Sequence, residues 1–138
     1  MGLISAVFQG ITTTQFFLYG RKRFTATGWE EASKAYKPGQ LENADLHAKV
    51  YMVTGANGGI GREVAEYLAS KGSTVYMVCR DKGRGETAKA DIVEKTRNEN
   101  VNVLLGDCGL QKDVRRVMTE FGSKEKRLDG LVCNAGTV

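Results

Sequence analysis

A glycine-rich segment, residues 54–61, has the residue types and spacing best suited to hold a phosphate group. It reads Thr-Gly-Ala-Asn-Gly-Gly-Ile-Gly and directly follows the apolar run of residues 50–53. The stretch after it is compatible with a helix, so the glycines form the turn from a strand into a helix. Backbone N–H groups of a first helical turn point at a bound anion, and the helix dipole favours its negative charge. We therefore predict that this turn cradles the pyrophosphate of a dinucleotide.

Three glycines of this turn have separate expected roles. Gly55 permits the tight reversal out of the strand, and Gly59 lets the backbone approach a pyrophosphate with no Cβ in the way. Gly61 allows the helix to pack close to the strand. A tight turn that binds nothing is the structural alternative, but a glycine turn that follows a strand and opens a helix favours phosphate binding.

The end of the second expected strand bears on which dinucleotide binds. An acidic residue here would bind the ribose 2′-hydroxyl of NAD, whereas an arginine accommodates the 2′-phosphate of NADP. Arg80 comes first, and Lys82 and Arg84 follow it, so the sequence favours NADP over NAD. Asp81 is the counter-argument, because a carboxylate turned inward would repel a 2′-phosphate and pair with Arg80.

Short apolar runs alternate with charged stretches from residue 49 onward. The expected strands are residues 50–53, 74–78, 101–105 and 128–133, and the expected helices are about residues 59–71, 85–98 and 112–124. This rhythm predicts an α/β fold with a partial, Rossmann-like, doubly wound parallel sheet. Right-handed crossovers then give the strand order 3-2-1-4. In the first of these helices we expect a buried stripe of Ile60, Val64, Tyr67 and Leu68.

Residues 1–48 are predicted to form an amphipathic, helical N-terminal extension, separate from a dinucleotide-binding domain over residues 49–138. The first 20 residues carry no charge, and their apolar residues follow helical spacing until Thr12–Gln15 interrupts it. Six of these 20 are Ser, Thr or Gln, so a helix lying on a membrane surface or a protein partner fits better than a spanning helix. A mitochondrial transit peptide and packing against the chain's own domain are the alternatives.

Composition narrows the remaining classes of function. Residues 1–29 carry three basic residues and no acidic one, so the rest of the chain carries only +1 of the net charge of +4. This balance lacks the basic stripe of a nucleic-acid-binding protein. Three widely spaced cysteines indicate a reducing compartment, cytoplasmic or membrane-associated, and we expect them to pack as small buried residues. No metal site is predicted, and the single histidine, His47, is expected at the surface.

Residues 49–138 resemble the short-chain dehydrogenase/reductase family. The resemblance rests on the spacing Gly-x-x-x-Gly-x-Gly after Thr54, on Asp107 after the third strand, and on Asn-Ala-Gly at residues 134–136. It implies that Asp107 accepts a hydrogen bond from the adenine amino group, and that residues 134–136 line the ribose and tie the fourth strand to its neighbour. Cys133 departs from the family, which has a first Asn at this position. Residues 20–42 resemble the N-terminal extension of the branch called dehydrogenase/reductase member 12.

The candidate cofactor-binding residues follow from the glycine turn, the end of the second strand and this resemblance. They are Thr54, Gly55, Asn57, Gly58, Gly59, Ile60, Gly61, Arg80, Asp81, Asp107, Cys108, Asn134, Ala135 and Gly136. No catalytic residue is predicted, because the family's Ser, Tyr and Lys come after its Asn-Ala-Gly motif.

Two functions are compatible with these observations. The first is the NADP-binding half of an oxidoreductase that reduces a carbonyl group or oxidises an alcohol, with a lipid-like or retinoid-like substrate. The second is a non-catalytic, truncated structural or accessory subunit of a larger, membrane-associated complex. In both, the fourth strand is a sheet edge, so we expect a partner chain, a C-terminal half or the N-terminal segment to cover the open face.

Overall fold

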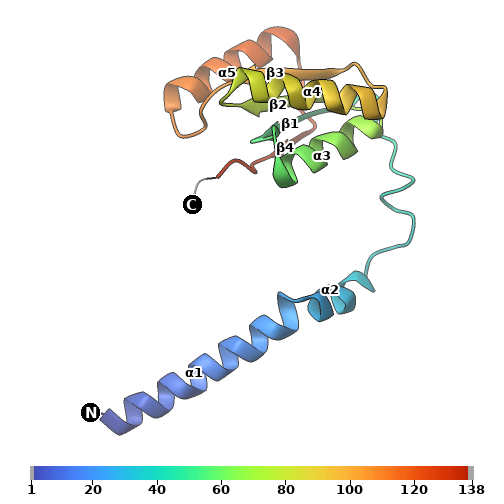
Figure 1. The fold of residues 1–138 in the computed structure, drawn as a ribbon. Coiled ribbons are helices and arrows are strands. Elements are labelled where there is room, and N and C mark those ends of the chain that lie inside the picture. Colours follow the sequence, from blue (N-terminus) through green and yellow to red (C-terminus); the bar gives the residue numbers. More distant parts are fainter. Residues whose placement is uncertain (1, 137–138) are drawn as a thin grey trace. The chain divides into compact units, whose positions relative to one another are not determined.

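A computed structural model describes the backbone of residues 2–136 and the side chains of residues 9–136. It divides the chain into two compact units, Met1–Ala44 and Asp45–Val138 (Figure 1). The second unit begins shortly before residue 49, where we expected the dinucleotide-binding domain to start.

The first unit contains α1 (Gly2–Arg23) and α2 (Ala26–Ser33). We expected Thr12–Gln15 to interrupt the first helix, but α1 is continuous. Thr14 Oγ1 donates to the carbonyl of Gly10 at 2.8 Å, so this hydroxyl is satisfied inside the helix instead of competing with it. Among the residues that the structure describes, no helix combines the length and the apolarity needed to cross a bilayer.

The second unit contains one parallel sheet whose order, β3-β2-β1-β4, confirms the predicted 3-2-1-4. Its strands are β1 (Val50–Thr54), β2 (Thr74–Cys79), β3 (Val101–Leu105) and β4 (Gly130–Val132). β4 is shorter than the predicted 128–133. Its ladder ends at Val132 because the next free amides, those of Asn134 and Ala135, donate to the side chain of Thr54 instead.

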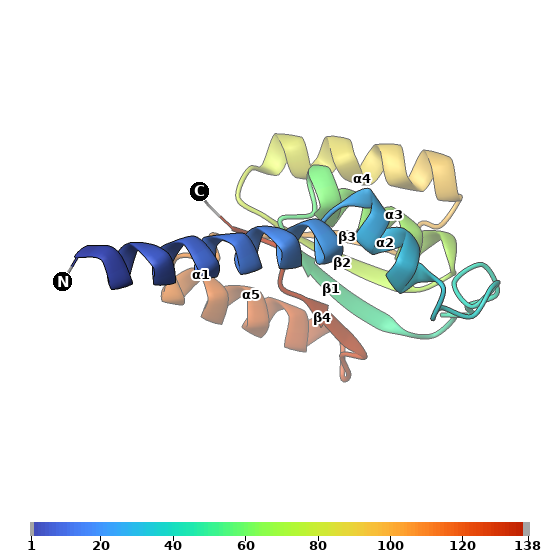
Figure 2. The same ribbon diagram turned by 90° about the horizontal axis from the view of Figure 1, so that it is seen from below.

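Three helices cover this sheet: α3 (Gly59–Ser70), α4 (Lys82–Thr96) and α5 (Gln111–Lys124). α3 and α4 lie on one face and α5 on the other (Figure 2). α4 begins three residues before the predicted position, because Asp81 caps it: its carboxylate accepts the backbone N–H of Arg84 at 2.7 Å.

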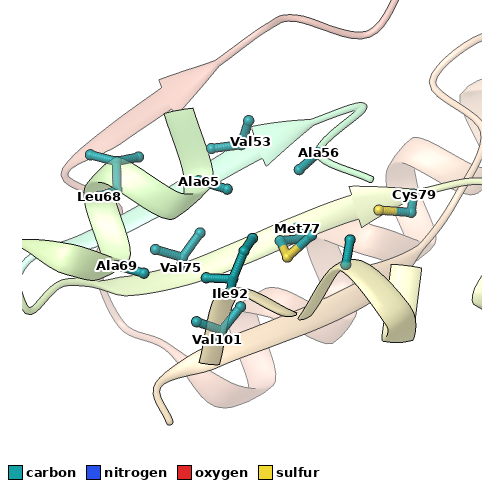
Figure 3. Close-up of a cluster of buried hydrophobic side chains, with 11 residues drawn as sticks. Val53, Ala56, Ala65, Leu68, Ala69, Val75, Met77, Cys79, Ile92 and Val101 are labelled. Carbon is teal, nitrogen blue, oxygen red and sulfur yellow. The ribbon is translucent and has the colours of Figure 1, made fainter. Parts of the chain in front are cut away.

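The larger core cluster lies between the sheet and the two helices α3 and α4 (Figure 3). Within α3 the buried residues are Gly61, Ala65, Leu68 and Ala69. The predicted stripe was therefore right for Leu68 but wrong for Ile60, which is 78% exposed. The helix meets the strands through its smallest residues, and that contact turns Ile60 away from the sheet.

The α5 face is only partly covered at the sheet edge. Leu131 of β4 pairs in register with Met52 of β1, so both side chains point to the same face. Met52 is buried in the cluster beneath α5, whereas Leu131 is 52% exposed. Val114 and Met118 of α5 are also exposed, so this end of the sheet presents apolar side chains that no other described part of the second unit, residues 45–136, covers.

The other end of β4 is joined to β1 by an aspartate. The Asp129 carboxylate accepts the backbone N–H of Val50 at 2.9 Å, forms an ion pair with Arg127 and lies 3.5 Å from Lys49 Nζ. The hydrogen bond from Arg127 and then the Val50 amide lower the pKa of Asp129 from 3.8 to about 2.

The stability of the sheet should therefore depend on pH through Asp129. Because its pKa is lower in the folded state, its stabilisation is complete above about pH 4 and is lost as the pH falls towards 2. We expect Asp129→Asn to flatten the fall of the melting temperature between pH 4 and pH 2, measured by circular dichroism. The control is Glu31→Gln, because Glu31 of α2 forms an exposed ion pair with Lys34, the residue that follows this helix. An unchanged slope in Asp129→Asn would show that another group controls acid unfolding.

Candidate functional site

A surface cleft lies at the carboxyl ends of the strands, the edge where parallel α/β sheets bind ligands. Its lining consists of Gly55, Asn57, Gly58, Gly59, Val78, Arg80, Asp81, Arg84, Gly106, Asp107, Cys108, Gly109, Asn134, Ala135 and Gly136. Most of the predicted site residues are thus brought together. Thr54 and Gly61 are not part of the lining, but both lie against its residue Asn134. Ile60 is exposed and lies outside the lining.

The glycine turn has the backbone geometry that was expected of it. Gly55 and Gly59 have φ values of +67° and +54°, which favour glycine. A Cβ on Gly59 would meet nothing within 4 Å, so it would occupy open space beside the turn. Gly58, the N-cap of α3, provides no side-chain hydrogen bond. The first amides of α3 are therefore left without a side-chain cap at the cleft, the arrangement that suits an anion.

One hydroxyl group joins the glycine turn to the segment after β4. Thr54 Oγ1 accepts the backbone N–H groups of Asn134 at 3.0 Å and Ala135 at 2.9 Å, and it donates to the carbonyl of Val132. Asn134 Nδ2 donates in return to the carbonyl of Thr54 at 3.0 Å. A Cβ on Gly61 would collide with this amide and lie 2.6 Å from the carbonyl oxygen of Gly55. The predicted tie between strand four and its neighbour is present, with Thr54 at its centre.

The charged groups at the end of β2 divide into two kinds. Arg80 and Arg84 both line the cleft. Asp81 also lies there, but its carboxylate is held by the backbone N–H of Arg84 as the cap of α4. Among residues 9–136, Asp81 forms no ion pair with Arg80. The pairing with Arg80 that was expected of an inward-turned Asp81 carboxylate is therefore absent from residues 9–136, and one oxygen of that carboxylate, Oδ1, is occupied by the cap.

Asp107 lies on the loop between β3 and α5. Its Oδ1 accepts the backbone N–H of Gly109 at 2.8 Å, and its own backbone N–H donates to Asp113 Oδ2 at 3.0 Å. This hydrogen bond, followed by that of Arg116, lowers the pKa of Asp113. Asp113 was not among the predicted site residues. Its signal in the sequence is an acidic residue in the first turn of α5.

The cysteines were expected to be buried, and this holds only for Cys79. Cys108 and Cys133 are exposed: Cys108 lies in the lining of the cleft, and Cys133 directly follows β4. Burial raises the pKa of the Cys79 thiol, although the backbone N–H groups of Ala56 and Asn57 partly offset it. Desolvation and the Asp107 charge raise the pKa of Cys108. Neither thiol is therefore activated as a nucleophile.

Within residues 9–136, no three His, Cys, Asp or Glu side chains come close enough to hold a metal ion. One tyrosine, Tyr67, has a lysine four residues later, Lys71, which is the spacing of a catalytic Tyr and Lys in the family that residues 49–138 resemble, although no catalytic residue was predicted. Lys71 Nζ lies over the Tyr67 ring, 5.8 Å from its centroid. Both residues are at the carboxyl end of α3, whereas the cleft is at its amino end, so this pair does not belong to the site.

Comparisons with known proteins agree with this geometry. A family model described as short chain dehydrogenase matches residues 49–138. Dehydrogenase/reductase SDR family member 12 of Bos taurus is 39% identical over 121 residues, and retinol dehydrogenase 12 of Homo sapiens is 43% identical over 96 residues. These matches cover 88% and 70% of this chain, but only 38% and 30% of the two relatives.

A solved structure shows the same arrangement of elements. It is L-sorbose reductase from Gluconobacter frateurii, determined in complex with NADPH and L-sorbose. The match has a TM-score of 0.63 and 31% identity, and it covers 67% of this chain and 35% of the reductase. The chain thus spans about a third of the length of these three proteins.

The hydrogen bonds of the Thr54 hydroxyl should contribute more to stability than the packing of this side chain does. In Thr54→Val the shape is kept, but the amides of Asn134 and Ala135 lose their acceptor. We expect a loss of about 1–2 kcal/mol in the free energy of unfolding, measured with urea. Thr54→Ser, which keeps the hydroxyl, is the matched control. Equal stability of the two variants would contradict a structural role for this hydrogen-bonded junction.

Proposed function

Because the chain belongs to the short-chain dehydrogenase family, we propose that it contains the NADP-binding half of an oxidoreductase that reduces a carbonyl group or oxidises an alcohol. One observation carries the proposal. The uncapped amino end of α3 and two arginines, Arg80 and Arg84, line the same cleft, so that donors and positive charge converge where a phosphorylated ligand would lie.

The residues of the cleft fit a dinucleotide in detail. The amides of the glycine turn and of α3 would hold the pyrophosphate, and the open space beside Gly59 would let it approach the backbone. Asp107 Oδ2 accepts no hydrogen bond from residues 9–136, so it is free to accept one from the adenine amino group. Residues 134–136 would line the ribose. When bound, the nicotinamide group supplies or accepts the hydride.

NADP is proposed over NAD on the electrostatics of the β2 end. An NAD-binding aspartate must direct its carboxylate at the ribose hydroxyls, but Asp81 Oδ1 accepts the N–H of Arg84, so one of its two carboxylate oxygens is already used. The guanidinium groups of Arg80 and Arg84 lie in the same lining and suit a 2′-phosphate. The related L-sorbose reductase was solved with NADPH, which supports this choice.

The substrate and the catalytic activity are proposed for the whole protein. Relatives named retinol dehydrogenase support a lipid-like or retinoid-like substrate. The alternative is a non-catalytic accessory subunit, which the exposed apolar side chains of Leu131, Val114 and Met118 favour as a surface for another chain. The intact mass of the protein from its native source separates the two. A mass well above 15.1 kDa supports the enzyme, and a mass near it supports the accessory subunit.

A membrane surface is proposed as the partner of residues 1–23. Phe16 and Phe17 of α1 are 75% and 67% exposed, and the helix ends in Arg21, Lys22 and Arg23 with no acidic residue before them. Exposed aromatic rings next to a basic cluster suit the headgroup region of an anionic bilayer. We propose a reducing, membrane-associated or cytoplasmic location, with mitochondrial targeting as the alternative.

Arg80 should distinguish the two dinucleotides. We expect Arg80→Ala to weaken NADPH binding about 10- to 100-fold, because a charge-assisted contact to the 2′-phosphate is lost, and to leave NADH binding nearly unchanged. Fluorescence titration of the nucleotide measures both affinities. Arg115→Ala, which removes an exposed arginine of α5 away from the cleft, is the control. Equal losses for NADPH and NADH would exclude a specific contact between Arg80 and the 2′-phosphate.

Removal of residues 1–23 should release the protein from anionic membranes. We expect the intact chain to sediment with phosphatidylserine-containing vesicles at low salt and to dissociate as salt rises, because exposed charges are screened. The variant Arg21→Gln/Lys22→Gln/Arg23→Gln should lose this preference for anionic lipid while it retains the aromatic side chains. Sedimentation that is unchanged by the deletion would contradict the membrane assignment.

A further inference from the structure

The loop between β3 and α5, residues 106–110, forms one wall of the cleft through Gly106, Asp107 and Gly109. Only the first residue of this loop is hydrogen-bonded to the sheet. Gly106 N donates to the carbonyl of Cys79 at 2.9 Å, and beyond it the loop leaves β2. The position of Asp107 is therefore set by contacts with α5, not by a strand ladder.

Asp113 makes the decisive contact. It is the third residue of α5, and its Oδ2 accepts the backbone N–H of Asp107 at 3.0 Å, while Oδ1 lies 3.3 Å from the guanidinium of Arg116. On the loop, Asp107 Oδ1 accepts the N–H of Gly109, and the carbonyl of Asp107 accepts the N–H of Leu110 at 3.0 Å. The N–H, the carbonyl and one carboxylate oxygen of Asp107 are all hydrogen-bonded, which leaves Oδ2 as its polar atom with no hydrogen bond from residues 9–136.

This use of Asp113 differs from ordinary helix capping. An acidic residue at the third helical position usually accepts the N–H of the N-cap residue. The N-cap here is Leu110, and its N–H donates to the carbonyl of Asp107 instead. Asp113 reaches three residues further back along the chain, so its carboxylate organises the loop rather than the end of its own helix.

Close packing makes α5 a firm base for this contact. Val117 and Phe121 are buried against the sheet. A Cβ on Gly106 would lie 2.5 Å from Val117 Cγ2, so the loop fits against the helix with no room for a side chain at that position. A shift of α5 would therefore move the loop, and the orientation of Asp107 with it.

We propose that Asp113 is a positioning residue, which holds Asp107 so that its free carboxylate oxygen meets the adenine ring of the dinucleotide. The inference rests on the proposed function, because it assumes that the cleft binds a dinucleotide. Asp113 touches no part of the ligand. It acts through the backbone of Asp107, and its effect on binding exists only while the Asp107 carboxylate is present.

A double-mutant cycle on the full chain tests this coupling. The dissociation constant of NADPH, with NADH as a second probe, is measured for Asp113→Ala, Asp107→Ala and the double variant. We expect Asp113→Ala to weaken binding about three- to tenfold, as for the loss of one hydrogen bond. The double variant should bind as Asp107→Ala does. Asp113→Asn, whose amide oxygen can still accept the Asp107 N–H, should restore affinity to within about twofold.

The controls separate the possible failures. Glu120→Ala removes another acidic residue of α5, one that pairs with Lys124 at the surface, and it should leave binding unchanged. Melting of each variant without ligand reports stability separately, and Asp113→Ser replaces the alanine variant if that one does not fold. A wild-type chain that binds neither nucleotide overturns the proposed function. Normal binding by Asp113→Ala, or an equal loss in the Asp107→Ala background, overturns the positioning role alone.

Discussion

The hydrogen bonds around the Thr54 hydroxyl are the contact on which the rest of the site depends. This group lies at the last residue of β1 and accepts two amides from the segment that follows β4. It thereby holds Asn134 against the glycine turn, and the amide of Asn134 closes the junction by donating to the Thr54 carbonyl. The turn has room for this contact only because Gly61 has no side chain. The strand edge, the turn and the start of α3 thus share one junction.

The acidic side chains of the cleft are held in place by backbone hydrogen bonds. Two arginines and two carboxylates lie in its lining, and one oxygen of each carboxylate accepts a backbone amide: Asp81 that of Arg84, and Asp107 that of Gly109. Such hydrogen bonds favour the charged form of a carboxylate and fix its direction. The amides at the start of α3 and the arginines supply the donors that a phosphorylated ligand needs.

Helices cover one face of the sheet fully and the other face only in part. α3 and α4 cover the first face with small residues that allow close packing, and α5 covers only part of the second. Leu131 is exposed at the edge, although its neighbour in register, Met52, is buried. An apolar side chain on an open strand edge is a site of association unless something covers it. The proposed covering surface, whether another chain or a further part of the protein, would therefore meet β4 and α5.

The sequence by itself determined the strand order and the glycine turn, because these follow from local periodicity and from the rules of crossover connections. Asp107 and residues 134–136 of the cleft were expected from the family resemblance instead. Only the tertiary structure decided how individual side chains point. α3 meets the strands through a face that leaves Ile60 exposed, and Asp81 Oδ1 caps α4 by accepting the N–H of Arg84. The bonds from Asn134 to Thr54 join residues 80 positions apart, and such partners become neighbours only after the sheet has formed.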